Sequence, residues 1–318
     1  RIKGHVEEEL KDKVYMRALI DAIQRTGNPS VIGLDPKPEL LPSILLEGAQ
    51  TPHDIADAYF AFNTAIIDAL YDIIPAVKPQ IAMYEALGIA GIETFIKTNE
   101  YAQSRGLYVL ADIKRGDIGS TAASYASHLS GTPQIEGMPR FDVWHEDAVT
   151  VNPYLGSDGI TPFVTAAVAT NKDIFVLAKT SNPSSSELQD LIIYGSIPHE
   201  TVAEHVAGLL EKWGESTRDE ETGYSHVGAV VGATHPIEGT KLRKLMPHTF
   251  FLVPGYGAQG GTGADLAGLF DDNGLGALVN SSRGIIGAWK KASEIPKFAT
   301  REDALAFVAR SARKAALA

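Results

Sequence analysis

The chain alternates short, strongly apolar runs with longer segments of mixed polarity. Most of the short runs are rich in Val, Ile and other strand-forming residues, and Gly, Pro, Asn or Ser stand at or near their ends. The runs cover residues 30–35, 76–80, 107–114, 148–154, 174–181, 226–234, 249–255 and 276–282. This pattern predicts eight consecutive β-strands.

Segments with helical periodicity separate most of these strands. The clearest examples are residues 54–73, 91–106 and 201–216. In the first of them, apolar residues recur at three- and four-residue steps, as one buried helix face requires: Ile55, Tyr59, Phe62, Ile66 and Leu70. Strands that alternate with helices imply a parallel sheet, and eight such units imply an α/β chain folded as a (β/α)₈ TIM barrel.

An open doubly wound sheet is the alternative fold, but no G-x-G-x-x-G turn follows the first strand. No linker or change of composition divides the chain, so we expect a single barrel domain over residues 1–318. Residues 1–29 read as an N-terminal helical extension. Its inward side is expected to carry Val14, Ala18, Leu19 and Ala22.

The two longest connections, residues 122–147 and 182–225, are rich in Ser, Gly, Pro and charge. Loops of this length in a barrel usually hold additional elements. We therefore expect them to form long insertions, with extra helices or flexible segments over one face of the barrel. The sequence does not assign a function to residues 182–225.

The composition limits the possible partners. The 318 residues carry a formal net charge of −11, which argues against a nucleic-acid surface, since that needs a basic face. No apolar run approaches the roughly 20 residues that span a bilayer, and the N-terminus lacks an apolar signal core. Together with the absence of cysteine, this leads us to expect a cytoplasmic protein without a membrane segment.

Charged residues gather where the third strand ends, in the stretch LYVLADIKRGDIGST. Because side chains alternate along a strand, Asp112 and Lys114 point the same way, and Asp117 follows on the loop. Asp35 and Lys78 stand near the ends of the first two strands. In a barrel all five would meet at the mouth, where active sites form. The alternative is a structural network of ion pairs that closes the barrel.

Two glycine-rich loops follow the seventh and eighth strands, at residues 253–263 and 280–289. Phosphate groups bind at this position in many (β/α)₈ barrels, because glycines let backbone N–H groups approach the oxygens. Arg283 could bind a phosphate with its two-pronged guanidinium. The alternative is that the glycines form tight turns and Arg283 lies on the surface.

The loop after the fifth strand, AKTSNPSSS, offers hydroxyl and amide groups to a ligand. Ser181 is the first candidate, Thr180 lies next to it, and Asn152 ends the fourth strand. These residues could instead cap turns or helices. The sequence leaves the choice between them open.

The motif L-x-D-x-K-x-x-D-[IV]-[GP]-x-T resembles the signature of the orotidine 5′-phosphate decarboxylase family. It is matched by Leu110, Asp112, Lys114, Asp117, Ile118, Gly119 and Thr121. The form D-x-K-R-G-D-I-G-x-T is similar to the longer bacterial branch of that family, and the resemblance extends from VIGLD at 31–35 to NSSRG at 280–284.

The resemblance implies decarboxylation of orotidine 5′-phosphate to UMP and CO₂, without a cofactor or metal, as the last step of pyrimidine nucleotide synthesis. It implies that Lys114 protonates C6 and that Asp112 lies against the substrate carboxylate. Asp117 would reach into the partner's site of a homodimer, near the ribose. Lys78 would complete the charged array, and Asp35 would accept a hydrogen bond from a ribose hydroxyl.

The same resemblance implies the rest of the substrate site. Arg283 and Gly284 match the family's phosphate-binding pair, and Gln259 would reach the phosphate and the pyrimidine O2. Pro254 would shape the base pocket, while a Ser in the region of Ser181 would contact the pyrimidine. The remaining residues expected to bind substrate are Gly260, Ile118 and Thr121.

Two other functions compete with this one. The first is that of a magnesium-dependent sugar-phosphate decarboxylase or aldolase, whose family shares the D-x-K-x-x-D motif and resembles the same superfamily. Those relatives place an acid on strand two, where this chain has Lys78. Glu85 is the nearest acid downstream. A non-catalytic nucleotide-binding barrel is the second rival, although a binder has no need for a lysine aimed at the ring.

Overall fold

A computed structural model describes residues 16–195, 199–233, 236–255 and 266–318 of the chain. Over these residues, eight parallel strands pair in sequential order and close into a barrel, because β8 pairs with β1. The strands are β1 (Ser30–Leu34), β2 (Ala76–Pro79), β3 (Tyr108–Arg115), β4 (Ala148–Val151), β5 (Asp173–Lys179), β6 (Val227–Val231), β7 (Phe251–Val253) and β8 (Ala277–Ser281). The predicted (β/α)₈ TIM barrel is confirmed, with each strand at or within a few residues of its expected position.

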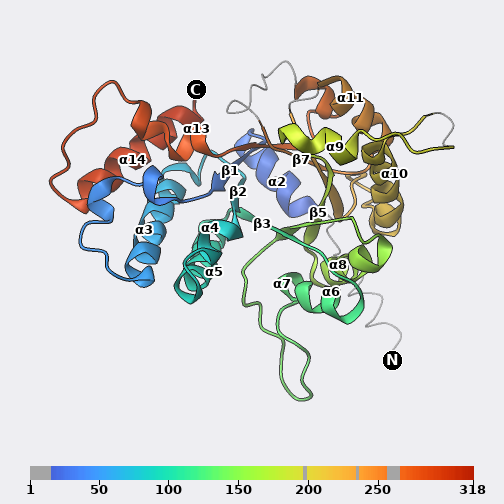
Figure 1. The fold of residues 1–318 in the computed structure, drawn as a ribbon, viewed down its shortest axis with the longest axis horizontal. Helices are drawn as coiled ribbons and strands as arrows, with labels where there is room; N and C mark the ends of the chain where they lie inside the picture. Colours follow the sequence, from blue (N-terminus) through green and yellow to red (C-terminus); the bar gives the residue numbers. More distant parts are fainter. Residues whose placement is uncertain (1–15, 196–198, 234–235, 256–265) are drawn as a thin grey trace.

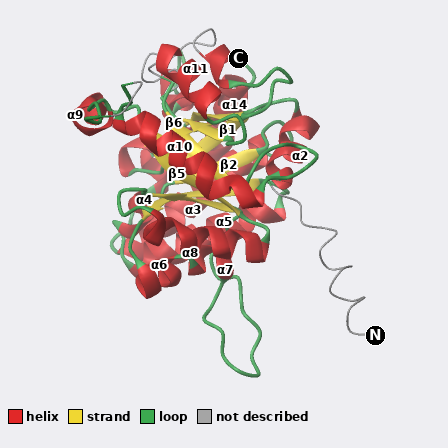
Figure 2. Ribbon diagram, turned by 90° about the vertical axis from the view of Figure 1, so that its right-hand side faces the viewer, coloured by secondary structure: helices red, strands yellow, loops and turns green. Residues whose placement is uncertain are grey.

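Helices surround the barrel (Figure 1, Figure 2). The α-helices are α2 (Arg17–Thr26), α3 (Pro52–Leu70), α4 (Ile81–Glu85), α5 (Ile89–Ser104), α6 (Gly119–Tyr125), α7 (Ser127–Ser130), α8 (Ser157–Thr170), α9 (Ser186–Gln189), α10 (Val202–Gly214), α11 (Pro236–Leu245), α13 (Arg283–Ile286) and α14 (Arg301–Ala316). Short 3₁₀ segments are η1 (Pro38–Leu40), η2 (Ser43–Leu45), η3 (Pro183–Ser185), η4 (Glu215–Thr217), η5 (Ala267–Leu269) and η6 (Ala288–Lys291). None of the helices in the described ranges is long and apolar enough to cross a membrane.

Helix α3 illustrates how an N-terminal cap and a buried apolar face stabilise a helix of this barrel. Thr51 caps it, accepting from the backbone N–H of Asp54, while the Asp54 carboxylate accepts from the backbone N–H of Thr51. Its predicted apolar face is buried at Tyr59, Phe62 and Leu70 and packs on the outer side of the barrel wall. The start of the helix is therefore set by its N-terminal cap, and its orientation by the spacing of its apolar residues.

The N-terminal helix α2 closes one end of the barrel. Its buried residues Leu19, Ile20 and Ile23 share one cluster with side chains from inside the barrel, such as Tyr108 and Leu110. These barrel residues lie near the amino ends of their strands, so the amino-terminal end of the barrel is sealed. The charged residues at the ends of the strands lie at the opposite, carboxyl-terminal end of the barrel.

The expectation for the inner face of this helix is partly wrong. Leu19 and Ala22 are buried as expected, but Ala18 is exposed, and Val14 lies outside the described residues. The larger residues Ile20 and Ile23 occupy the buried face, and at 100° per residue that rotates Ala18 outward.

The two long connections contain the expected extra helices. Residues 182–225 hold η3, α9, α10 and η4, and residues 122–147 hold α7 and a long loop. That loop is pinned at its base, where Thr132 N donates to Phe141 O over 3.0 Å. Beyond that point it extends away from the helical layer (Figure 1, Figure 2), not over the barrel as expected.

Candidate active site

A single carboxylate, that of Asp112, lies at the centre of the barrel mouth and accepts four hydrogen bonds. Lys78 Nζ donates to its Oδ2 over 3.0 Å and Gln80 Nε2 donates to the same oxygen over 2.9 Å. Lys114 Nζ donates to Oδ1 over 2.5 Å and Thr150 Oγ1 over 2.8 Å. The four donors come from β2, the residue after it, β3 and β4, and they occupy the usual accepting positions of a carboxylate.

Lys114 reaches Asp112 by a local break in the strand. The pairing of β3 with β4 shifts register between Ala111 and Arg115, and Lys114 adopts a left-handed backbone conformation with φ 45°. This conformation costs a non-glycine residue on the order of 1 kcal/mol. Thr150 Oγ1 holds it in place by accepting from the backbone N–H of Lys114 over 2.9 Å. Bulges of this kind re-aim side chains beside active sites.

The sequence predicted the meeting of Asp112 and Lys114 from simple alternation. The two side chains do meet, and Ile113 packs toward the helices as expected. However, the bulge and not an uninterrupted strand brings the lysine to the carboxylate.

The charges in this cluster stabilise one another. Burial alone would raise the pKa of Asp112, but Lys78 and Lys114 outweigh it and hold that pKa well below its ordinary value. Burial likewise lowers the pKa of Lys78, and the Asp112 and Asp35 carboxylates reverse this and raise it. The Asp112 carboxylate and the Lys78 ammonium therefore both stay charged at neutral pH.

A cavity of about 430 Å³ opens beside the cluster. It is lined by Lys78, Asp112, Lys114, Thr150, Leu177, Thr180, Ser181, Asn182, Gln189, Val230, Leu252 and Pro254. The cavity has the size of a small-molecule site, with apolar walls on one side and convergent polar groups on the other. Ser181 and Thr180 thus lie where the sequence placed them.

Asn152 is the candidate that the structure places elsewhere. Its Oδ1 accepts from the backbone N–H of Tyr154 over 3.0 Å, so it caps the turn after β4. It does not line the cavity next to Lys114.

A second cavity of about 470 Å³ meets the first at Pro254. Its lining includes Asp35 and Arg283 from the predicted set, together with Asn280 and Lys37. Asp35 Oδ1 and Asn280 Oδ1 are buried and have no hydrogen-bond partner within the described ranges. Such acceptors suit the hydroxyl groups of a sugar.

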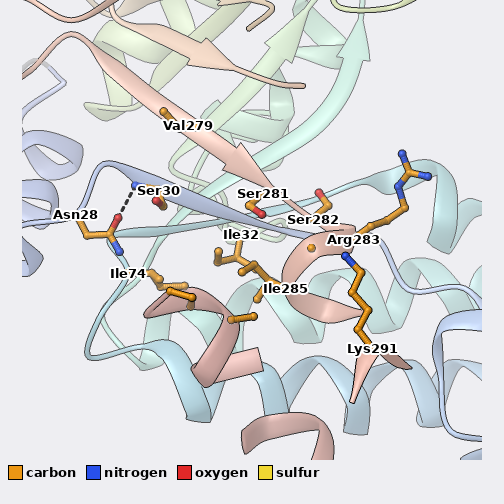
Figure 3. A pocket seen from close by; sticks show the side chains of 14 residues that line it. Asn28, Ser30, Ile32, Ile74, Val279, Ser281, Ser282, Arg283, Ile285 and Lys291 are labelled. Carbon is orange, nitrogen blue, oxygen red and sulfur yellow. Dashed lines mark hydrogen bonds between the residues drawn. The ribbon is translucent and has the colours of Figure 1, made fainter. Parts of the chain in front are cut away.

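Arg283 begins helix α13, one residue beyond the end of β8, with Ser282 between them. It is exposed and also borders a larger cavity of about 750 Å³ between the barrel wall and α14, together with Gly284. In Figure 3 its guanidinium points away from the Ser30 and Ile32 end of that cavity. We place the site in the two smaller cavities, because the first contains the charged cluster around Asp112 and the second adjoins it at Pro254. The larger cavity contains none of these charged residues.

Four predicted residues lie outside both smaller cavities in this single chain: Gly284, which borders only the larger cavity, and Asp117, Ile118 and Thr121. Asp117 is half-buried and its Oδ1 accepts from the backbone N–H of Ile118, while Ile118 and Thr121 are exposed. Two further predicted residues, Gln259 and Gly260, lie outside the described residues.

Sequence reasoning missed several side chains of the site. Gln80 and Thr150 bind Asp112 directly, and both could have been found from strand alternation: Gln80 is two positions after Lys78, and Thr150 is the polar member of an apolar strand. Asn182 and Gln189 also line the cavity, but no periodic signal marks them.

Glu85, the acid considered as a metal ligand, forms an ion pair with Arg115 over 2.6 Å. Among the described residues, no three His, Asp or Glu side chains are grouped as a metal site would need.

Comparisons with known proteins identify the family of the chain. Residues 31–298 match the model of the orotidine 5′-phosphate decarboxylase / HUMPS family. The chain is 45% identical over 272 residues to orotidine 5′-phosphate decarboxylase of Rhodopirellula baltica, covering 85% of this chain and 87% of that protein. It is 40% identical over 278 residues to the Caldicellulosiruptor bescii enzyme of the same name, covering 86% and 89%. A solved structure of a candidate orotidine-monophosphate decarboxylase from Toxoplasma gondii superposes with a TM-score of 0.73 at 28% identity, covering 96% and 98%.

Proposed function

We propose a role for each side chain of the candidate active site, and the proposal starts from the family. The chain belongs to the orotidine 5′-phosphate decarboxylase / HUMPS family. Its activity is the decarboxylation of orotidine 5′-phosphate to UMP and CO₂, the final step of pyrimidine nucleotide synthesis. The enzyme is thus a carboxy-lyase. The observation that carries the assignment of roles is the Asp112 carboxylate, held ionised between the ammonium groups of Lys78 and Lys114.

In this proposal Lys114 is the proton donor. When the bond between C6 and the carboxyl carbon breaks, the electron pair stays on C6 in the ring plane, where the ring delocalises it poorly. An ammonium fixed beside C6 stabilises this charge and then transfers a proton to it, so that one proton is consumed for each CO₂ released. The Lys114 side chain is 46% exposed and lines the cavity, so it is accessible to a ligand.

Asp112 has the opposite effect on the bound substrate. Its ionised carboxylate would lie close to the substrate carboxylate and repel it, and this repulsion fades as neutral CO₂ forms. Lys78 keeps Asp112 charged and in place.

The remaining contacts hold the nucleotide. Ser181 would bind the pyrimidine in the cavity next to Lys114, and Asp35 a ribose hydroxyl in the neighbouring cavity. Arg283 and Gly284 would bind the phosphate, with Gln259 and Gly260. Binding energy from this remote phosphate can offset the strain at C6. No cofactor takes part in the proposed reaction.

We propose that the active unit is a homodimer that shares Asp117. Asp117, Ile118 and Thr121 line neither of the two smaller cavities of their own chain, which is consistent with residues that serve a partner's site. Apolar side chains are exposed on the same region, with Ile118 at 52% and Tyr154 at 79%. Apolar surface of this kind is typical of an interface. Because phosphorylated nucleotides do not cross membranes unaided, we also propose that the enzyme acts in the cytoplasm.

The test replaces Lys114 with Ala and follows pyrimidine absorbance with orotidine 5′-phosphate in metal-free buffer. We expect kcat to fall at least about 10⁴-fold, since both charge stabilisation and proton transfer are lost, while UMP still binds. Lys97→Ala, an exposed lysine on α5, is the matched control and should keep full activity. Turnover by Lys114→Ala within tenfold of the wild type would remove this lysine from the reaction.

A further inference from the structure

The loop after β5 forms one wall of the cavity beside Lys114, and Gln189 of helix α9 fixes its conformation. Gln189 Oε1 accepts from the backbone N–H of Thr180 over 2.8 Å. A backbone N–H can only donate, so this bond decides which end of the Gln189 amide carries the oxygen. Its Nε2 must then donate to Thr180 Oγ1, 2.7 Å away.

The Thr180 hydroxyl, oriented by Gln189, in turn orients the side chain of Asn182. Because Thr180 Oγ1 already accepts from Gln189, its own hydrogen is free to donate, and Asn182 Oδ1 accepts it over 2.5 Å. The Asn182 amide is thereby oriented, with its oxygen toward Thr180 and its nitrogen directed elsewhere. No hydrogen-bond partner for that nitrogen is found in the described part of the chain, and Asn182 lines the cavity.

The loop is held from two further sides. Lys179 is fully buried and pairs with Asp190, the residue after Gln189, which fastens α9 to the end of β5. On the opposite side, the backbone of Gly232 approaches Ser181 so closely that a Cβ there would lie 2.9 Å from the Ser181 Cβ. Thr180, Ser181 and Asn182 thus have little freedom to adapt to different ligands.

We propose that Gln189 is a positioning residue for base recognition: through Thr180 it makes Asn182 present an N–H donor to the C4 carbonyl oxygen of the pyrimidine. Uracil and orotate carry a carbonyl at C4, whereas cytosine carries an amino group there. Two donors facing each other leave both unpaired, so the oriented Asn182 selects the keto base and rejects the amino base. This inference rests on the proposed function, since it assumes that the base lies in the cavity beside Lys114.

The test uses an isosteric change that replaces the donating amide nitrogen with an accepting oxygen and also adds a negative charge. In Gln189→Glu, both carboxylate oxygens accept. Thr180 N–H keeps its partner, but the Thr180 hydroxyl now donates to Glu and releases Asn182. The amide of Asn182 can then turn and present its oxygen. Thr180→Val removes the same hydroxyl by another route, and Glu187→Gln, an exposed residue of α9, is the matched control.

The measurement is the dissociation constant of UMP and of CMP for each protein, by titration calorimetry. We expect the ratio of the CMP constant to the UMP constant to fall about tenfold or more in both variants and to stay unchanged in the control. A merely structural role would weaken both nucleotides equally and leave the ratio intact, which would overturn the proposal.

Two measurements on the wild-type protein, turnover of orotidine 5′-phosphate and binding of UMP and CMP, distinguish failure of this inference from failure of the proposed function. If it decarboxylates orotidine 5′-phosphate yet binds UMP and CMP equally, the relay is refuted and the function stands. If it neither turns over the substrate nor binds UMP, both are refuted.

Discussion

Replacing Lys78 with Met removes a buried ammonium and leaves a buried carboxylate with one fewer cation. In the wild type, Lys78 Nζ lies 3.0 Å from Asp112 Oδ2, and the two side chains are only 7% and 9% exposed. Met fills a similar volume, so packing changes little. The experiment therefore measures the cost of an uncompensated charge.

The structure limits the size of this cost. At 3.0 Å and an effective dielectric constant of about 20, the attraction between two unit charges is about 5 to 6 kcal/mol. Part of it is offset because the Lys78 ammonium no longer needs to be desolvated. Breaking a buried pair typically costs about 3 to 5 kcal/mol. Since Lys114, Gln80 and Thr150 still bind Asp112, we expect the low end, about 3 kcal/mol.

The assay is urea unfolding of four proteins: wild type, Lys78→Met, Asp112→Asn and the double variant. If the cost comes from the stranded carboxylate, Lys78→Met should be nearly harmless in the Asp112→Asn background. A single variant within 1 kcal/mol of the wild type would contradict the reasoning. So would an equal loss in both backgrounds.

The dependence on pH gives a second check. The pKa of Asp112 is lowered in the folded state, so its contribution to stability is present above the unfolded value of about 4 and is lost as pH falls. The pKa of Lys78 is raised, so its contribution is present below about pH 10 and is lost at still higher pH. The difference between wild type and Lys78→Met should therefore be full between about pH 4 and 10 and shrink below pH 4. A difference that grows on acidification would refute the assignment.

Three further predictions follow from the site. Arg283→Ala should lower kcat/KM by about 3 kcal/mol, or roughly a hundredfold, through loss of its phosphate contacts; unchanged kinetics would remove it from the site. Gly232→Ala should weaken UMP binding about tenfold in a calorimetric titration, because the new methyl displaces Ser181; an unaltered affinity would show that this wall of the cavity yields. Lys114→Ala and Asp117→Ala proteins, each inactive alone, should regain about a quarter of wild-type activity when mixed and allowed to exchange subunits, and no recovery would argue against a shared site.

Much of the fold could be read from the chain because each strand and helix carries its own local signal. The β-branched runs and the period of α3 fix the elements, and eight repeats of strand and helix leave a closed barrel as the natural arrangement. The face of α2 was harder to predict, since the exposure of Ala18 depends on which apolar residues the barrel interior accepts.

The candidate site was predictable to the extent that strand ends determine position. Asp35, Lys78, Asp112 and Lys114 end neighbouring strands of a barrel, so they had to come near one another. Their exact partners were not predictable. Strand alternation places Gln80 and Thr150 on the inner face of the barrel, but their bonds to Asp112 depend on the relative height of three strands, which the sequence does not encode locally.

By itself, then, the sequence determined the barrel, its open end and the charged residues around that end, because these follow from periodicity and strand order. Tertiary structure alone decided the bulge that turns Lys114 back to Asp112 and the chain of hydrogen bonds from Gln189 to Asn182. The physical reason is that both depend on contacts between segments whose register and distance are set only when the whole barrel closes.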